Sequence, residues 1–457
     1  MIKTLKADIV IIGSGAGGAA IAKELSRLNK KVYILEKGSQ PKNLGSELFA
    51  SQLYDKCALF TKSKEGVLIY RAIALGGTTL VSCGNGVRAL EKELADKKID
   101  LAEELSDAEK ELNVKPNPFI SKTSRAITDI SSSIGINMIP TPKFLDKEKC
   151  TLCSRCVLGC KPRAKWSALS YIKEAESNGV KVFTNTTVQK VLSHRGKITG
   201  VRAKKRGKNF VVKAKLVILC AGALETPVIL QNSGLEAGKN LFCDLLNVTY
   251  GISKKYSLLK EPSMSIVTDM DFFNKNHFIL APFLDSFLVL LTLIPSRSDL
   301  KRRQLKWLRK RVEDEANLQD NLHINYPAKA LRRKNLIGIM TKIKDSNIGS
   351  ISKKGVISKY PTAEDLKRLQ LGSSLAKKIL LKMDIDPKSI IVTKTRGAHP
   401  GGTAAIGDVV NADLETKIKG LFVCDASVFP ESAGLPPILT IIALAKRLSK
   451  KIIKDFN

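Results

Sequence analysis

The sequence predicts an α/β fold in which a Rossmann-type dinucleotide-binding domain is interrupted by an inserted α+β substrate domain. Three observations support this prediction. A glycine-rich turn joins a strand pattern to a helix pattern within residues 8–28, and a further apolar strand pattern lies far along the chain, at residues 215–222. At 457 residues the chain is also too long for one ordinary domain.

The glycine-rich turn has the order that a nucleotide-binding turn requires. A short, mostly apolar strand over residues 8–12 leads directly into G-S-G-A-G-G at residues 13–18, and a helical pattern follows. Gly13 permits the tight turn, Gly15 lets the backbone approach a pyrophosphate, and Gly18 allows the helix to pack closely on the strand. The pyrophosphate then lies at the helix N-terminus, where free N–H groups favour negative charge.

A second strand pattern supports the same site. Residues 31–35 are mostly apolar and lead into Glu36, eighteen residues beyond Gly18. A carboxylate at this position accepts hydrogen bonds from ribose hydroxyls, which favours an unphosphorylated ribose, as in FAD or NAD, over NADP. The alternative interpretation is a βαβ unit that binds nothing.

Later strand patterns indicate that the nucleotide-binding domain is assembled from separated pieces of the chain. Residues 180–188 and 215–222 are expected to form additional strands, and Val188 in the first is a candidate cofactor contact. We therefore expect other material, including the substrate domain, to be inserted between these pieces.

The charge of the chain is strongly positive, with a formal net charge of +33. Such a charge produces a positive field over much of the surface. An aromatic content of 5% and the lack of a nucleic-acid-reading motif argue against nucleic acid as the partner. An anionic membrane surface, an acidic redox partner and a lysine-rich proteome remain as explanations. With no secretory signal pattern and no run of about twenty apolar residues, we expect a cytoplasmic protein without a transmembrane helix.

The segment at residues 297–312 has a basic amphipathic pattern. Residues 297–311 hold eight basic side chains and one acidic one, and Trp307 falls on the apolar arc of a helical plot. Such a helix suits the headgroup region of an anionic bilayer, although it can also pack on the protein. Peripheral membrane contact through this segment favours a lipophilic substrate. The preceding apolar run, residues 287–294, has the length of a buried strand.

Further glycine-containing segments add to the nucleotide-binding pattern. The sequence G-G-T-T occurs at residues 76–79, and A-G-A at residues 221–223 is followed by Pro227. Together with the first turn, these segments resemble flavin-contacting loops of the glucose-methanol-choline (GMC) oxidoreductase family. The resemblance covers roughly residues 1–85, 150–242 and 336–457 and implies FAD as the cofactor. Beyond those named above, the residues it marks as candidate cofactor contacts are Gly76, Gly77, Thr78, Ala221, Gly222, Asp425 and Ala426.

The C-terminal region carries the most specific part of the resemblance. It contains H-P-G-G-T at residues 399–403 and L-F-V-C-D-A-S at residues 421–427. The resemblance implies that Asp425 lies near the ribityl or pyrophosphate part of FAD and that His399 lies beside the reactive face of the flavin. A neutral imidazole there can take the proton of a substrate hydroxyl while hydride moves to the flavin. A structural histidine that holds the loop is the alternative.

One position departs from the family pattern. The family normally has a second polar residue, Asn or His, just before the proline of its last motif, and here that position is Pro436. Proline has no polar side chain and no N–H. His323, in N-L-H-I-N-Y at residues 321–326, is a candidate replacement, and a surface or core histidine is the alternative.

A cluster of cysteines lies between the flavin-contacting segments. Cys150, Cys153, Cys156 and Cys160 have the spacing of a bacterial ferredoxin, with one residue added before Pro162. Soft thiolates select iron–sulfur clusters or zinc, so we predict a [4Fe–4S] or [3Fe–4S] cluster, with zinc or metal-free thiols as alternatives. Because the fourth cysteine can serve another site, further candidate ligands are Cys57, Cys83, Cys220 and Cys243.

These observations predict three segments and one leading function. Residues 1–242, including the cysteine loop 150–160, form the first part of the FAD domain, residues 243–335 the substrate insertion, and residues 336–457 the region that returns to the FAD domain. The leading prediction is an FAD-dependent dehydrogenase that oxidises a CH–OH donor, a lipophilic alcohol, and passes electrons through an iron–sulfur cluster to a carrier protein or a quinone. A flavin-dependent reductase of an isoprenoid double bond is one alternative. A non-enzymatic flavin electron carrier or nucleic-acid-binding protein is the other.

Overall fold

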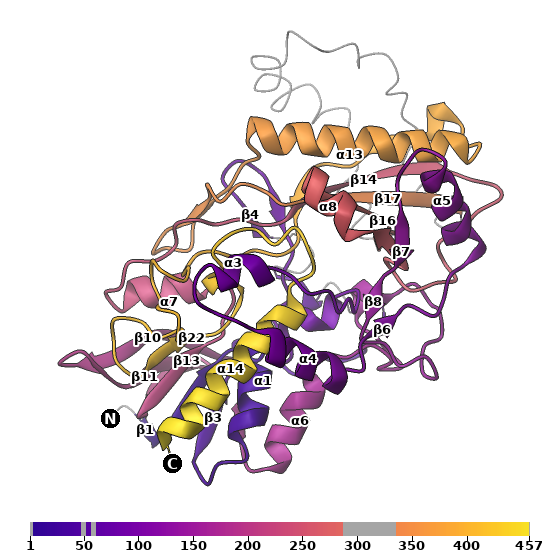
Figure 1. Ribbon diagram of the computed structural model, residues 1–457. Coiled ribbons are helices and arrows are strands. Elements are labelled where there is room, and N and C mark those ends of the chain that lie inside the picture. The colour runs from indigo at the N-terminus through magenta and orange to yellow at the C-terminus, as the bar shows by residue number, and fades with distance from the viewer. Residues whose placement is uncertain (1–2, 47–51, 56–60, 287–334, 457) are drawn as a thin grey trace.

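The computed structural model describes residues 3–46, 52–55, 61–286 and 335–456. It contains two large sheets, each with its own helical cover (Figure 1). The segments at residues 287–294 and 297–312, together with His323 and Cys57, lie outside the described residues, so the predictions made for them stay predictions.

The first large sheet is parallel and has five strands. Their order across the sheet is β22-β13-β2-β3-β9, and every neighbouring pair is parallel. Strands from both ends of the chain therefore meet in one sheet, which confirms the predicted Rossmann-type α/β fold. The five strands are β2 (Ile9–Ile12), β3 (Val32–Leu35), β9 (Lys181–Phe183), β13 (Leu216–Leu219) and β22 (Leu421–Val423).

Helices cover this sheet, and the first of them, α1 (Ala16–Leu25), begins directly after the glycine turn. It packs against α14 (Ile438–Phe456) and α6 (Leu169–Ser177), and α14 also contacts α4 (Ala102–Glu111) (Figure 1). Close packing of α1 depends on small residues: a Cβ added to Gly18 would lie 2.1 Å from the carbonyl oxygen of Gly13.

The second large sheet is mixed and draws its strands from distant parts of the chain. Its order is β16-β17-β14-β21-β5-β4, with β20 also pairing with β14. Helix α13 (Ala363–Lys382) covers the sheet and begins with a capping box between Thr362 and Asp365 (Figure 1). The strands are β4 (Thr61–Lys62), β5 (Leu68–Ile69), β14 (Leu245–Ile252), β16 (Phe278–Pro282), β17 (Leu336–Ile343), β20 (Ile391–Val392) and β21 (Arg396–Gly397).

All three predicted segments contribute strands to this second sheet. Residues 61–69 come from the first segment, residues 245–282 from the second and residues 336–397 from the third. The sheet is therefore built by long-range pairing, and the proposed segment boundaries stay a prediction.

Smaller elements complete the described fold. A four-stranded sheet has the order β1-β12-β11-β10 and comprises β1 (Lys3–Lys6), β10 (Thr186–His194), β11 (Lys197–Lys205) and β12 (Lys208–Lys213). The remaining elements are η1 (Gly77–Val81), α3 (Glu91–Ala95), β6 (Lys115–Pro116), α5 (Lys122–Ser132), β7 (Met138–Pro140), β8 (Pro142–Lys143), η2 (Cys156–Leu158), α7 (Thr226–Asn232), β15 (Ile266–Thr268), α8 (Met270–Asn276), β18 (Ser350–Ile351), β19 (Ile357–Ser358), η4 (Pro387–Ser389) and η5 (Ala426–Val428). Among the described helices, none combines the length and apolar character needed to cross a membrane.

Candidate active site

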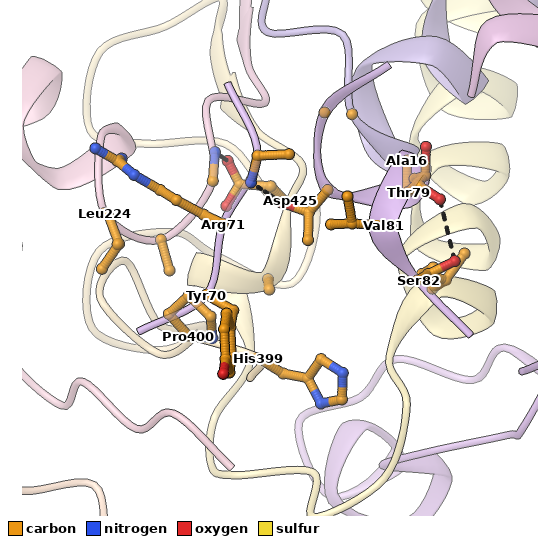
Figure 2. A pocket seen from close by; sticks show the side chains of 18 of the residues that line it. Ala16, Tyr70, Arg71, Thr79, Val81, Ser82, Leu224, His399, Pro400 and Asp425 are labelled. Atoms are coloured by element: carbon orange, nitrogen blue, oxygen red, sulfur yellow. Dashed lines mark hydrogen bonds between the residues drawn. The ribbon is translucent and has the colours of Figure 1, made fainter. Parts of the chain in front are cut away.

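A cavity of about 340 Å³ lies where the two large sheets approach one another. Its walls include the glycine turn before α1 and the ends of parallel strands on one side, and β14, β17 and the loop after β21 on the other. Figure 2 shows Asp425 and Arg71 in one part of this pocket and His399 projecting into its open space in another. Pockets between two structural units are common places for cofactors and substrates.

The glycine turn leaves room for a ligand at the N-terminus of α1. A Cβ added to Gly15 would meet no described atom of the chain within 4 Å. Because the N-cap residue of α1 is glycine, no N-cap side chain binds the first backbone N–H groups of the helix. By contrast, a Cβ on Gly13 would lie 2.2 Å from the carbonyl oxygen of Cys220. Gly13 is therefore required by packing, whereas Gly15 faces open space in which a pyrophosphate would fit.

The carboxylate of Glu36 stabilises this turn. Oε2 accepts hydrogen bonds from Ser14 N (3.0 Å) and Ser14 Oγ (2.6 Å), and Oε1 accepts one from Gly38 N (2.6 Å). Burial raises the pKa of Glu36. Glu36 lines the cavity at the end of β3, but its predicted contact with ribose stays a prediction.

The second glycine loop closes over the first. Gly76 N donates to Ser14 Oγ (3.0 Å), and a Cβ on Gly77 would lie 3.0 Å from Gly15 Cα. Thr78 Oγ1 accepts from Ala72 N (3.1 Å), which holds the start of η1 in place. The two predicted cofactor loops therefore form one continuous surface.

Asp425 connects two turns at the end of the cavity where the glycine turn lies. Its carboxylate accepts hydrogen bonds from Gly222 N (2.9 Å), Thr226 Oγ1 (2.7 Å) and Ser427 N (2.8 Å). Burial raises the pKa of Asp425. This residue thus ties the β22 turn to the β13 turn, and both turns line the cavity.

Most of the predicted cofactor contacts line the cavity. Gly18 and Gly76 are not among the lining residues, because Gly18 packs against Gly13 and Gly76 bonds to Ser14. The predicted contacts that do line it are Gly13, Gly15, Glu36, Gly77, Thr78, Val188, Ala221, Gly222, Asp425 and Ala426.

His399 lies at the other end of the cavity, on the loop that follows β21. Its Nδ1 is 2.8 Å from Oδ2 of Asp244. A carboxylate can only accept there, so Nδ1 carries the proton and Nε2 is left as an acceptor. Burial, reinforced by the charge of Lys342, lowers the pKa of His399 and keeps the imidazole neutral near pH 7.

Asp244 is fully buried and has several donors. Its Oδ1 accepts hydrogen bonds from Ser432 Oγ (2.8 Å) and Gly434 N (2.9 Å). Burial acts to raise the pKa of Asp244, but the hydrogen bond from His399 and the charge of Lys342 outweigh it and lower the pKa. Asp244 is therefore a carboxylate that fixes the orientation of the imidazole.

The side chain of Lys342, on β17, lies close to both Asp244 and His399. Its side chain is 1% exposed, and Nζ lies 3.8 Å from Asp244 Oδ2 and 3.5 Å from His399 Nδ1. Burial lowers the pKa of Lys342 to about 8. An ammonium group, a carboxylate and an imidazole therefore share one end of the cavity.

The walls around this end are otherwise largely apolar. A buried ion pair between Arg396 Nη2 and Asp285 Oδ2 (2.7 Å) is the further charged feature among the lining residues there. Pro436 also lines the cavity and offers no polar side chain. The apolar lining residues contributed by the substrate side include Leu246, Met264, Phe283, Met340 and Ala398.

Comparison with known families identifies the fold. The two family models for GMC oxidoreductase match residues 8–246 and 359–445. The chain belongs to the GMC oxidoreductase family. This GMC oxidoreductase is 30% identical to an uncharacterized protein of Methanocaldococcus jannaschii, over 98% of this chain and all of the relative. It is also 24% identical to a long-chain-alcohol oxidase of Arabidopsis thaliana, over 99% of this chain and 68% of the plant protein.

Solved structures share the fold. Pyridoxine 4-oxidase from Mesorbium loti superposes with a TM-score of 0.71 at 15% identity, covering 98% of this chain and 99% of that one. Formate oxidase from Aspergillus oryzae superposes with a TM-score of 0.74 at 13% identity, covering 100% and 99%. As a member of the GMC oxidoreductase family, the protein is a flavoprotein whose cofactor is FAD. The open space at Gly15, beside the N-terminus of α1, fits the pyrophosphate of that cofactor.

Several polar residues of this GMC oxidoreductase site were not predicted from the sequence. Asp244 and Lys342 were missed, as was the ion pair of Arg396 with Asp285. A signal for Lys342 exists, because it is a lone basic residue in an apolar strand over residues 336–343. Asp244 has no such local signal, since it follows an ordinary apolar run.

The cysteine loop does not support the predicted metal centre. Among the described residues, no group of three or more His, Cys, Asp or Glu side chains is arranged to hold a metal ion. Burial, with a smaller contribution from the neighbouring thiols, raises the pKa of Cys150. Of the further candidates, Cys83 and Cys220 line the cavity, and Cys243 is buried in the core. The cysteine loop does, however, form part of the cavity wall through Val157, whose carbonyl accepts a hydrogen bond from Tyr54 Oη (2.6 Å).

Proposed function

We propose that this protein oxidises the CH–OH group of a largely apolar alcohol to a carbonyl. The observation that carries the proposal is the hydrogen bond of 2.8 Å between His399 Nδ1 and the buried carboxylate of Asp244, at the end of the cavity away from the glycine turn. This pair holds an acceptor nitrogen in a site that is otherwise mostly apolar.

His399 acts as the general base. Because Nδ1–H is held by Asp244, Nε2 is free to accept the proton of the substrate hydroxyl. The lowered pKa of His399 keeps Nε2 unprotonated at neutral pH. Bound FAD supplies the acceptor for the hydride that leaves the carbon. Atoms and charge then balance: the alcohol loses one proton and one hydride, and a carbonyl forms.

The substrate class follows from the walls and is supported by the relatives. Leu246, Phe283 and Met340 line the end of the cavity where His399 lies, so an alkyl or prenyl chain can bury its surface there. Relatives that align over nearly the whole chain include long-chain-alcohol oxidases of Arabidopsis thaliana. A sugar would leave hydroxyl groups without partners against these walls.

Anaerobic flavin bleaching tests the proposal directly. We expect 1-decanol and geraniol to reduce the bound flavin faster than ethanol or glucose, with the rate rising as the apolar chain lengthens. Failure of every alcohol to bleach the flavin would contradict the proposal. If geraniol instead reoxidised chemically reduced flavin, the result would favour the alternative function, a flavin-dependent reductase of an isoprenoid double bond.

The electron acceptor is a separate question, and the iron–sulfur path rests on cysteine spacing alone. The Cys153 side chain is exposed and does not line the cavity. We therefore expect Cys153→Ser to keep its flavin and to be reduced by 1-decanol at the wild-type rate. Iron and zinc analysis of the two proteins after anaerobic purification tests for the cluster. Iron that is present in the wild type and lost from Cys153→Ser would establish the cluster, whereas metal-free wild-type protein would rule it out.

A further inference from the structure

The missing polar residue at Pro436 raises the question of what else in the cavity can act on the substrate oxygen. His399 supplies one polar group, and Pro436 supplies none. A single base can take the hydroxyl proton, but the negative charge that develops on the oxygen also needs a donor. The structure places one candidate donor beside His399.

Lys342 reaches the cavity because of strand alternation. On β17, Met340 and Lys342 both line the cavity, whereas the intervening Thr341 faces α13, where a Cβ on Gly372 would lie 2.1 Å from the Thr341 methyl group. The Lys342 position is paired with Leu246 of β14 and Ile279 of β16, so its backbone is held from both sides. The direction of this side chain is therefore fixed by the sheet.

The ammonium group of Lys342 has N–H donors without a close acceptor among the described residues. Within the described part of the chain, the carboxylate in ion-pair range of Nζ is that of Asp244, at 3.8 Å, which is too long for a strong hydrogen bond. His399 Nδ1, at 3.5 Å, already donates to Asp244 and cannot accept. A buried ammonium without a close acceptor costs free energy unless a ligand supplies one.

The surrounding charges suit a cation that stays protonated. Besides Asp244 and His399, the titratable group facing Lys342 is Cys83, and burial raises the pKa of that thiol to about 12, so it is neutral. The Arg396–Asp285 pair in the same cavity neutralises itself. Lys342 and Asp244 then balance one another, and His399 is free to change its charge during the reaction.

We propose that Lys342 is a second catalytic residue, whose ammonium group donates a hydrogen bond to the oxygen of the reacting CH–OH group while His399 accepts the proton of that oxygen. The O–H proton passes to Nε2 of His399, the C–H hydrogen leaves with its electron pair to the flavin, and the carbon–oxygen double bond forms. Lys342 keeps its proton throughout. This assignment rests on the proposed oxidation of an alcohol.

The test compares Lys342→Met with a matched control on the same strand end, Lys344→Met. Lys344 pairs with Glu93 (2.8 Å) and Glu431 (2.6 Å) and does not line the cavity. With flavin content and folding verified, single-turnover reduction by 1-decanol should slow about 10²-fold in Lys342→Met, as for loss of a donor to a developing oxyanion. Lys344→Met should keep the wild-type rate.

The pH profile separates a catalytic role from a structural one. In the wild type, reduction should slow above about pH 8, where Lys342 loses its proton, and at low pH, where His399 gains one. In Lys342→Met the high-pH limb should vanish, and the low-pH limb should move to higher pH because the cation that lowers the pKa of His399 is gone. Lys342→Arg stays protonated, so its high-pH limb should also vanish even if the Met variant does not fold.

Binding of decanoate provides a measurement that needs no turnover. Its carboxylate places a negative oxygen where the substrate oxygen would lie, and the perturbed flavin spectrum reports binding. We expect the Kd to rise at least about tenfold in Lys342→Met, and in the wild type above pH 8. Unchanged decanoate affinity together with an unchanged high-pH limb in either Lys342 variant would overturn the assignment. If 1-decanol fails in the wild type but decanoate binding depends on Lys342, the proposed oxidation fails while the oxyanion-binding site stands.

Discussion

At the scale of residues, one carboxylate, that of Asp244, holds the side chains in place at the end of the cavity where His399 lies. Asp244 sits in the left-handed backbone region, with φ of 44°, which aspartate tolerates better than most residues. Its Oδ1 is held by Ser432 and Gly434, so Oδ2 points to His399. The orientation and tautomer of the His399 imidazole, the proposed base, are therefore set by Asp244.

Replacing Asp244 tests this positioning role. In Asp244→Asn, the amide oxygen is expected to keep the donors Ser432 and Gly434, which turns the NH₂ group toward His399 Nδ1. Nδ1 must then accept, Nε2 carries the proton, and the base is lost. We expect retained flavin and a reduction rate lower by about 10²–10⁴-fold, the size of effect seen when a buried triad carboxylate is replaced.

The pH dependence of Asp244→Asn has a defined sign. The Asp244 carboxylate raises the pKa of His399, opposing the effects of burial and of Lys342. Its removal should therefore move the low-pH limb of any residual activity to lower pH, opposite to the shift in Lys342→Met. A shift to higher pH, or no loss of rate, would show that Asp244 does not position the base.

The sequence predicted His399 as a candidate base but did not predict its partners, and the reason is physical. His399 stands within a local motif, H-P-G-G-T, whose order is itself the signal. Asp244 and Lys342 are 155 and 57 positions away from it in the chain and meet it only when β14 and β17 pair. Proximity of this kind depends on tertiary structure, which local patterns do not contain.

At the scale of elements, the glycine turn and α1 were predictable because their rules are local. Gly13 and Gly18 are needed where added Cβ atoms would clash, at 2.2 Å and 2.1 Å respectively, and Gly15 borders open space in which the predicted pyrophosphate would fit. The second sheet was not predictable to the same degree, because β5 pairs with β21, which lies more than three hundred residues further along the chain. Its pairing is set by long-range burial.

Substitutions at Gly15 and Gly18 should have different effects, on flavin binding in the first case and on stability in the second. The backbone at Gly15 has φ of −69°, which any residue adopts, so Gly15→Val should fold and lose most of its flavin because the side chain fills the pyrophosphate space. Gly18→Ala should instead lower stability by about 1–3 kcal/mol through overpacking. Flavin absorbance and thermal unfolding measure both. Full flavin occupancy in folded Gly15→Val would contradict the cofactor assignment.

At the scale of the whole molecule, the fold joins two sheets with different tasks. The parallel sheet brings the glycine turn and Asp425 to one end of the cavity, and the mixed sheet brings Lys342 and the loop of His399 to the other. The net charge of +33 is not reflected at the reactive end, where Lys342 and Arg396 are each matched by a carboxylate. Peripheral contact with an anionic membrane stays a prediction, since the segment at residues 297–312 lies outside the described residues.

The most direct test of the account is stopped-flow reduction of the flavin by 1-decanol, without oxygen, in the wild type and in His399→Ala. Because Ala removes the acceptor Nε2 but leaves the cofactor end of the cavity intact, we expect full flavin content and a reduction rate lower by about 10²–10⁴-fold. Equal reduction rates in the two flavin-loaded proteins would contradict the central claim that His399 takes the proton of the substrate hydroxyl.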